Sequence, residues 1–524
     1  MANQKNFAIT PSVSISRSKF RRPSQHKTSF NLGKLVPIYV DADILPGDTV
    51  SIDLAALVRM STPIAPIMDN IYIDYYAFFV PNRLVWTGWK AFMGENTSTS
   101  GAVTEPTFPT IEIGSSNKPQ VGSLGDYMGL PTVTGTGNLG VSALPGRSYL
   151  LIYNEWFRDQ NLIAPLYVET GNVQLRLGQN NGSNLFYNMS LLTAAKESDY
   201  FTRALPYAQK GSPVTLPLGS TAPVYLAGSN LIAGAVTLST DATSIGVQNL
   251  HQLTAANAGD SFGTLRVDLS NATASTINQL RFAFQYQKFL EKDALYGTRY
   301  WEILKGHFGI TAPDASLQRP ELLGHFRQHI NVDQVLQTSE SGTTALGTPG
   351  ANSVSGKSEH LISKSFVEHG TLMILAVARH DQTYGQGINR MWSRKTRTDF
   401  YFPVFANLGA QEIKNKEIYA VGGSSDEQVF GFQEAWAEYR YKPSIVTGLL
   451  NPARSGSLSF WDLANNFGSL PTLSQSFIEQ DRANLARALV TGVSGPDFIA
   501  DFYFDAVYVR PMPMYSIPGL IDHH

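Results

Sequence analysis

The chain has 524 residues, 43% of them hydrophobic and only 16% charged, so it can bury a sizeable core and carries few charges for its size. Its 44 Gly, 28 Pro, 23 Tyr and 28 Phe favour strands joined by many turns over a helical bundle. The absence of Cys excludes disulfides, thiolate zinc sites and a cysteine nucleophile, and no apolar run approaches the roughly 18 residues that a membrane span needs.

The net charge of −2 is unevenly distributed, because residues 1–40 hold seven Lys and Arg and no acidic residue. We interpret residues 1–34 as a basic, extended N-terminal arm. Its cations, with one ring among them, suit single-stranded nucleic acid, since cations meet phosphates and a ring stacks on a base. An arm that is simply solvated, or that braces neighbouring subunits, stays open. The candidate nucleic-acid-binding residues are Arg17, Lys19, Phe20, Arg21, Arg22 and Lys27.

Strand signals lie near both ends of the chain. Residues 35–54 predict two short strands around the Pro46-Gly47 turn, and the aromatic run of residues 71–81 predicts another. The continuous apolar run of residues 371–379 is typical of a central strand. Residues 500–511 alternate, which predicts a half-buried strand whose inner face carries Phe502, Phe504, Ala506 and Tyr508.

Helices are expected at residues 148–162, 277–295 and 476–490. The last of these begins with a capping box, in which Ser476 and Glu479 each satisfy a backbone N–H of the first turn.

Two segments differ in composition from the rest of the chain. Residues 211–275 contain only four charged side chains and several short apolar stretches, which predicts a small inserted protrusion of strands and loops. Residues 338–358 are low in complexity and predict a flexible surface loop.

Three motifs that could indicate a ligand site are judged incidental. The G-x-G-x-x-G of residues 135–140 is followed by a helix-breaking stretch, and the near P-loop of residues 350–358 has the wrong spacing. His325 and His329 lack the Glu of a zinc-protease motif and are interpreted as two histidines on one helix face. We therefore expect no catalytic residue, no metal site and no cofactor.

Long blocks of the chain resemble the major capsid protein of the gokushovirus branch of microviruses, which are small bacterial viruses with single-stranded DNA. The blocks follow in the family's order and cover nearly the whole chain. They lie at residues 20–49, 60–86, 144–162, 196–211, 281–309, 319–339, 402–413 and 439–443.

This resemblance implies an eight-stranded antiparallel viral jelly roll over residues 35–524, with large helix and loop insertions between strands. It implies self-assembly into a T=1 icosahedral shell around a circular single-stranded DNA genome, with residues 211–275 projecting at the threefold axes to meet the host. Other partners are a small basic internal DNA-binding protein and a host cell-surface receptor. The expected location is the virion, assembled in the host bacterial cytoplasm without membrane insertion. The competing class is a glycan-binding, lectin-like β-sandwich, which has no need of an acid-free basic N-terminus.

Overall fold

The computed structural model describes residues 15–95, 105–113, 118–132, 139–172, 175–176, 189–214, 224–226, 265–267, 277–340, 342 and 345–515. The chain divides into two compact units. The smaller is Gln209–Lys292, and the larger combines Met1–Ala208 with Asp293–His524.

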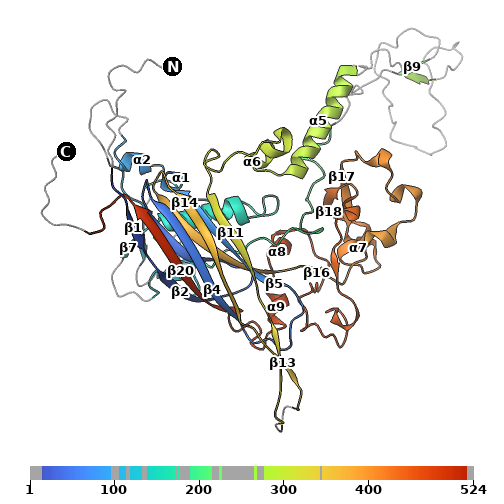
Figure 1. Cartoon of the computed structure of the whole chain (residues 1–524). Coiled ribbons are helices and arrows are strands. Elements are labelled where there is room, and N and C mark those ends of the chain that lie inside the picture. The colour runs from blue at the N-terminus through green and yellow to red at the C-terminus, as the bar shows by residue number, and fades with distance from the viewer. Residues whose placement is uncertain are drawn as a thin grey trace, which may run out of the picture. The chain divides into compact units, whose positions relative to one another are not determined.

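The larger unit is built on two antiparallel sheets that share one hydrophobic core (Figure 1). The first sheet has the order β14–β4–β20, with β1 and β2 both paired to the free edge of β20, and the second has the order β11–β5–β15–β3. The strands are β1 (Ser18–Arg21), β2 (Ser24–Phe30), β3 (Leu35–Ile44), β4 (Thr49–Met60), β5 (Ile71–Pro81), β11 (Glu321–His329), β14 (Ser355–Ser365), β15 (Gly370–His380) and β20 (Phe498–Arg510).

β1 and β2 act as one edge strand that is interrupted at Arg22 and Pro23. Both pair antiparallel with β20, and between them the Arg22 N–H donates to the Ala506 carbonyl at 2.7 Å. Pro23 has no N–H to give to a ladder, so an edge strand is where the sheet tolerates it. If β1 and β2 are counted as one strand and the strands of the sandwich are renumbered from 1 to 8 along the chain, the sandwich has eight strands. Their order is 1-8-3-6 in the first sheet and 2-7-4-5 in the second. This is jelly-roll connectivity, and the predicted eight-stranded antiparallel jelly roll is confirmed.

Residues 18–30 are therefore part of the jelly roll and do not form a free arm. The side chains of β2 alternate, with Lys27 exposed, Thr28 half-buried and Phe30 fully buried against Phe498 at a ring separation of 5.5 Å. The segment has an arm-like composition because the exposed face of an edge strand tolerates charged side chains. Its inner face contributes to the core through contacts that the local sequence does not reveal.

The strands predicted from hydrophobic pattern are confirmed. In β20 Phe502, Phe504, Ala506 and Tyr508 are buried, as the alternation predicts. β15 is buried along its whole length, which fits its central place between β5 and β3. The two strands around Pro46-Gly47 are β3 and β4, and the turn between them carries the chain from one sheet to the other.

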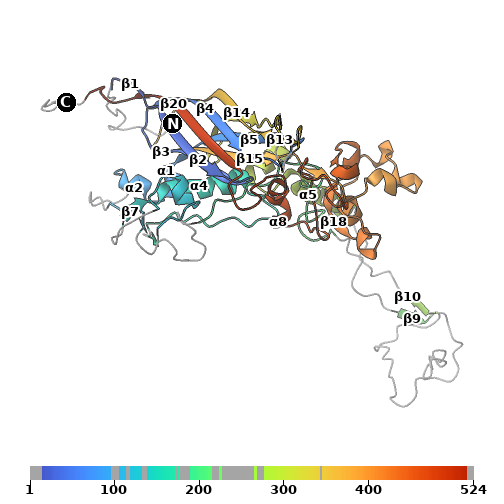
Figure 2. The ribbon, with the colours of Figure 1, turned by 90° about the horizontal axis from the view of Figure 1, so that it is seen from below.

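The long segments between strands are insertions in the jelly roll. Residues 82–320 separate β5 from β11, residues 330–354 separate β11 from β14, and residues 381–497 separate β15 from β20. The first insertion packs α1 (Asn82–Val85), α3 (Leu124–Tyr127) and α4 (Leu144–Ile152) on the second sheet, as Figure 2 shows for α1 and α4. The outward face of the first sheet carries exposed side chains instead, among them Asp53, Leu57, Arg59, Ile499 and Tyr503.

Two of the three predicted helices are confirmed. Residues 148–162 overlap α4 and the π-helical turn Tyr153–Phe157 that continues it, and residues 277–295 correspond to α5 (Ile277–Tyr296).

The helix predicted for residues 476–490 is wrong. Two single turns, α8 (Gln475–Ile478) and α9 (Ala483–Ala486), replace it, and Ser474 takes the N-cap position in place of Ser476. The Ile478 carbonyl accepts the Lys196 N–H at 2.8 Å, and the Arg482 guanidinium binds the Asp497 carboxylate at 3.0 Å. Because Lys196 takes the Ile478 carbonyl that a continuous helix would use, and the Arg482 side chain is held on Asp497, the chain turns between the two short helices.

The described residues of 338–358 include strands. β12 (Asp333–Leu336) and β13 (Pro349–Asn352) form a two-stranded hairpin, and residues 355–358 already belong to β14. Figure 1 shows this hairpin extending beyond the end of the sandwich.

The smaller unit contains most of the predicted protrusion, and most of residues 211–275 lie outside the described residues. Two short antiparallel strands, β9 (Val224–Leu226) and β10 (Leu265–Val267), are described there, in agreement with the predicted strand-and-loop character.

Candidate nucleic-acid interface and charged clusters

The six predicted nucleic-acid-binding residues are divided between the two faces of the first sheet. Lys19, Arg21 and Lys27 point outward and are exposed, and Arg17 is exposed just before β1. Phe20 is half-buried against the core, and Arg22, although its side chain is 41% exposed, turns its guanidinium toward Asp41 of β3. The division follows from the two-residue period of a strand, which separates neighbouring side chains.

The outward cations are only partly neutralised by their own chain. The Arg21 guanidinium forms a two-bond ion pair with the Asp505 carboxylate, at 2.6 and 2.8 Å. Lys19 and Lys27 have no ion-pair partner among the described residues, and Lys27 lies opposite Asp501, whose carboxylate accepts from the Gln25 amide at 2.7 Å. The face thus presents free ammonium groups beside exposed Tyr503, a ring on an open sheet surface.

A polar groove of about 660 Å³ lies beside Lys27. Its other walls include Tyr127, Asp126 and Arg482. The charge of Arg482 is balanced by the Asp497 carboxylate, so the remaining charges of the groove are those of Lys27 and Asp126. The groove has room for a nucleotide-sized ligand.

Phe20 and Arg22 have structural partners. Phe20 packs against the hydrophobic core. The Arg22 guanidinium lies 2.9 Å from the Asp41 carboxylate and 4.8 Å from the centre of the Tyr508 ring. The Tyr508 hydroxyl donates to the same Asp41 oxygen at 2.7 Å. These two residues therefore fix the edge strand to β3 and β20, and neither lies on the surface that carries the free cations.

The second sheet contains a buried charged cluster that no local sequence pattern predicted. Asp74 of β5 is fully buried and accepts from Arg327 at 2.7 and 3.1 Å, from Arg379 at 3.1 Å and from His325 at 3.3 Å. Burial raises the pKa of Asp74, but the hydrogen bonds from His325 and Arg327 and the charge of Arg379 outweigh it and lower the pKa to about 2. The cluster joins β5, β11 and β15.

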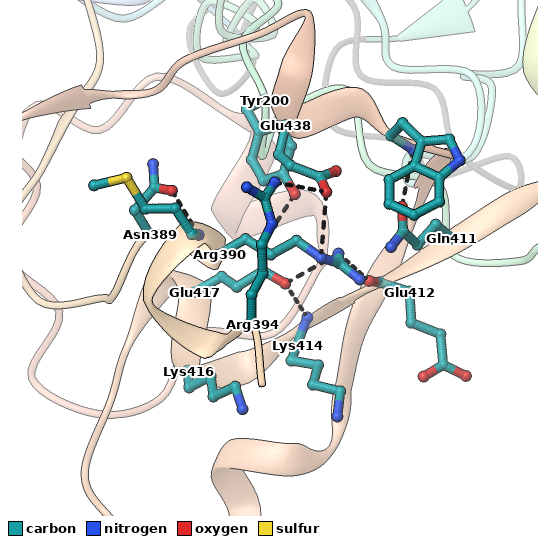
Figure 3. Close-up of polar contacts among 12 residues, drawn as sticks. Tyr200, Asn389, Arg390, Arg394, Gln411, Glu412, Lys414, Lys416, Glu417 and Glu438 are labelled. Atoms are coloured by element: carbon teal, nitrogen blue, oxygen red, sulfur yellow. Dashed lines mark hydrogen bonds and ion pairs between the residues drawn. The ribbon is translucent and has the colours of Figure 1, made fainter. Parts of the chain in front are cut away.

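Another charged cluster lies in the insertion between β15 and β20 and underlies residues 390–405 (Figure 3). Arg390 lies between Glu417 and Glu438, at 3.4 and 3.8 Å, and Arg394 lies 3.4 Å from Glu438. Burial raises the pKa of Glu417, a shift that also occurs in catalytic acids.

The oxygens of Glu417 are already occupied. Oε1 accepts from Arg390 and from the Lys414 N–H at 3.0 Å, and Oε2 accepts from the Tyr200 hydroxyl at 3.0 Å. A carboxylate tied down in this way braces the local fold and has no free oxygen to transfer a proton.

The motifs judged incidental in the sequence have structural positions. His325 and His329 lie on β11, not on a helix; they are four residues apart, and so they share the outward face of a strand. The near P-loop falls on β13 and β14, and Gly135 and Gly137 lie outside the described residues. Among the described residues no group of His, Asp and Glu is arranged to hold a metal ion. No helix in the described part of the chain is long and apolar enough to cross a membrane.

Comparison with known proteins connects this architecture to virus coats. The family model described as "Capsid protein (F protein)" matches residues 8–520. The chain is 42% identical to "Capsid protein VP1" of Bdellovibrio phage phiMH2K, over 99% of this chain and 98% of that protein. It is 38% identical to "Capsid protein VP1" of Spiroplasma virus 4 and 37% identical to that of Chlamydia phage 1, in each case over 98% of this chain and 97% of the relative.

These relatives match nearly the whole chain. The sequence alone allowed two classes, a viral coat protein and a glycan-binding β-sandwich. The relatives decide for the coat protein, which is a structural component of the virion. The chain belongs to the Capsid protein (F protein) family of phage coat proteins, and it assembles with copies of itself into a capsid.

Proposed function

We propose that this coat protein forms a T=1 icosahedral shell around a circular single-stranded DNA genome, and that the outward face of the β1/β2–β20–β4–β14 sheet contacts that genome. One observation carries the proposal. Helices of the first insertion pack on the outer side of the second sheet, whereas the first sheet presents exposed Lys19, Lys27 and Arg59. A face with free cations and an exposed ring suits a packaged strand of any sequence.

The cations can be tested without disturbing the fold. We expect the triple variant Arg17→Ala, Lys19→Ala, Lys27→Ala to assemble normally and to package less DNA, as measured by the nucleic-acid content of purified particles. Each phosphate contact with single-stranded DNA contributes about 0.7 to the slope of log K against log salt concentration, where K is the binding constant for the DNA. Removal of three cations should therefore make this slope shallower by about 2. Arg22 is left unchanged because its ion pair with Asp41 supports the strand.

A control variant removes similar charges elsewhere. Lys442→Ala with Arg454→Ala alters two exposed cations of the insertion between β15 and β20 and should leave the DNA content unchanged. Wild-type DNA content in the triple variant would contradict the proposed interface and favour a bracing role for the N-terminal strand. A small basic internal DNA-binding protein would supply the remaining neutralisation of the genome.

We further propose that residues 211–275 form an outer protrusion that clusters at the threefold axes and binds a host cell-surface receptor. Support comes from composition, since only Asp241, Asp260, Arg266 and Asp268 are charged in this stretch, and from the separate compact unit to which it belongs. Assembly would take place in the bacterial cytoplasm, which suits a chain without Cys.

Replacing residues 211–275 with a short Gly-Ser linker should give shells that assemble but no longer adsorb to host cells. The change in loop length costs little closure entropy, about 0.6 kcal/mol for each doubling. Particle yield by sedimentation and binding to cells are the two measurements. Loss of assembly would make the segment structural, and undiminished adsorption would place receptor binding elsewhere on the particle.

A further inference from the structure

The β12–β13 hairpin has little support from its own chain. All four residues of β12 are exposed, and the two strands pair only with each other among the described strands. Val335, Leu336 and Leu346 are 51%, 52% and 66% exposed, respectively. A two-stranded ribbon is marginally stable by itself in water, so apolar side chains on it indicate a surface that another molecule covers.

The base of the hairpin is firmly fixed, which makes it a stiff projection. The Asn331 N–H donates to the Ser355 hydroxyl at 2.8 Å, and the Ser353 hydroxyl donates to the Asn331 carbonyl at 2.7 Å. Residues 331–354 contain two acidic residues, Asp333 and Glu340, and no Lys or Arg. The hairpin therefore fits a partner surface that is apolar with a cationic rim.

Such a surface occurs on the same chain, in the segment of residues 390–405. Met391, Trp392 and Val404 are 54%, 74% and 81% exposed, and Phe400 and Tyr401 are 49% and 43% exposed. Lys395 and Arg397 lie exposed among them. We call this segment the aromatic segment.

The aromatic segment is held in place before any partner binds. Arg390 and Arg394 anchor it to the buried carboxylates of Glu417 and Glu438 (Figure 3). The Trp436 indole N–H donates to the Phe405 carbonyl at 3.1 Å. A surface fixed in this way loses little entropy when a partner packs on it.

The hairpin and the aromatic segment belong to insertions that leave the same end of the sandwich. β11 ends with His329 opposite Tyr72, and β15 ends with His380 opposite Ile71, so both chains emerge at the start of β5. Among the described residues, no backbone hydrogen bond joins the two surfaces within one chain. Copies arranged around an axis at this end would bring the hairpin of one to the aromatic segment of the next.

We infer that the β12–β13 hairpin of each subunit packs on the aromatic segment of a second copy of this chain. Val335, Leu336 and Leu346 would cover the exposed rings, while Asp333 and Glu340 face Lys395 and Arg397. Such a head-to-tail contact joins different surfaces and closes into a ring when repeated around an axis. The inference rests on self-assembly and adds which surfaces meet.

Because the chain has no Cys, engineered cysteines give an unambiguous test. We expect particles of the double variant Leu346→Cys, Val404→Cys to yield disulfide-linked dimers and longer ladders after mild oxidation, read on a non-reducing gel. Each single variant should stay monomeric on the same gel. Both positions are highly exposed, so the substitutions should not disturb folding.

The matched control pairs Leu346→Cys with Val367→Cys. Val367 is 87% exposed but lies in the turn between β14 and β15, at the opposite end of the sandwich, so no ladder is expected. Particles that form without cross-links in the first double variant, or that cross-link equally in the control, would overturn the inference. Failure of the wild-type chain to form T=1 particles would instead count against the proposed shell.

A charge exchange gives a second, independent readout. Glu340→Lys should lower particle yield several-fold, and adding Arg397→Glu to the same chain should restore it, because the two charges face each other again across the contact. Arg397→Glu alone should also lower the yield. Equal yields in all three variants would contradict the pairing of these two surfaces.

Discussion

Asp74→Ala should lower the free energy of unfolding by about 3–5 kcal/mol, because it leaves the buried Arg379 cation without its carboxylate. The Arg379 side chain is only 10% exposed, so water compensates for little of the loss there, whereas Arg327 is 32% exposed and keeps the Glu197 carboxylate at 2.9 Å. The cluster ties β5 to strands on both of its sides, and its loss should weaken the whole second sheet. Urea unfolding of the soluble full-length chain, followed by tryptophan fluorescence, measures the change.

The matched control is Asp505→Ala, which breaks the ion pair with Arg21 on the open sheet face. Arg21 is 65% exposed in that pair, and exposed pairs contribute about 0–1 kcal/mol. Equal destabilisation by the two variants would show that the buried cluster has no special role.

The pH dependence of Asp74 provides a further check. The folded-state pKa of about 2 lies below the ordinary value of 3.8, so the unfolded chain binds this proton first as the pH falls. The stabilisation is complete above about pH 4 and is lost between about pH 4 and pH 2. A shift of this size corresponds to about 2 kcal/mol, and the gap between wild type and Asp74→Ala should narrow by about that amount in acid.

Deletion of residues 2–30 should prevent folding, although a free arm could be removed without harm. The deletion takes away the edge strand that pairs along β20 and removes the Phe30 ring that packs on Phe498. Loss of one buried Phe side chain alone costs about 3–5 kcal/mol, against a typical total stability of about 5–15 kcal/mol. We expect the deleted chain to be insoluble or to lack a cooperative thermal transition by circular dichroism.

The comparison variant for the deletion is the triple cation variant, which keeps the strand and changes only exposed side chains. It should unfold within a few degrees of the wild type. A soluble deletion variant that melts cooperatively near the wild-type temperature would show that β1 and β2 are dispensable.

The sequence by itself determined the strands whose pattern is local. The strict alternation of β20 shows that one face of this strand is buried, and the unbroken apolar run of β15 shows that both of its faces are buried. Pro46-Gly47 predicts a turn from the backbone preferences of these two residues alone. The block-by-block resemblance determined the family and, through it, the eight-stranded jelly roll.

Only the tertiary structure decided what depends on residues far apart in the chain. Lys19 and Phe20 are neighbours in sequence, yet pairing with β20 places one on the open face and the other against the core. Asp74 meets Arg327 and Arg379 only because their strands lie side by side. The helix expected at residues 476–490 is interrupted where the Ile478 carbonyl accepts from the distant Lys196 N–H. In each case the deciding contact spans a distance along the chain that no local pattern records, so composition and periodicity could not predict it.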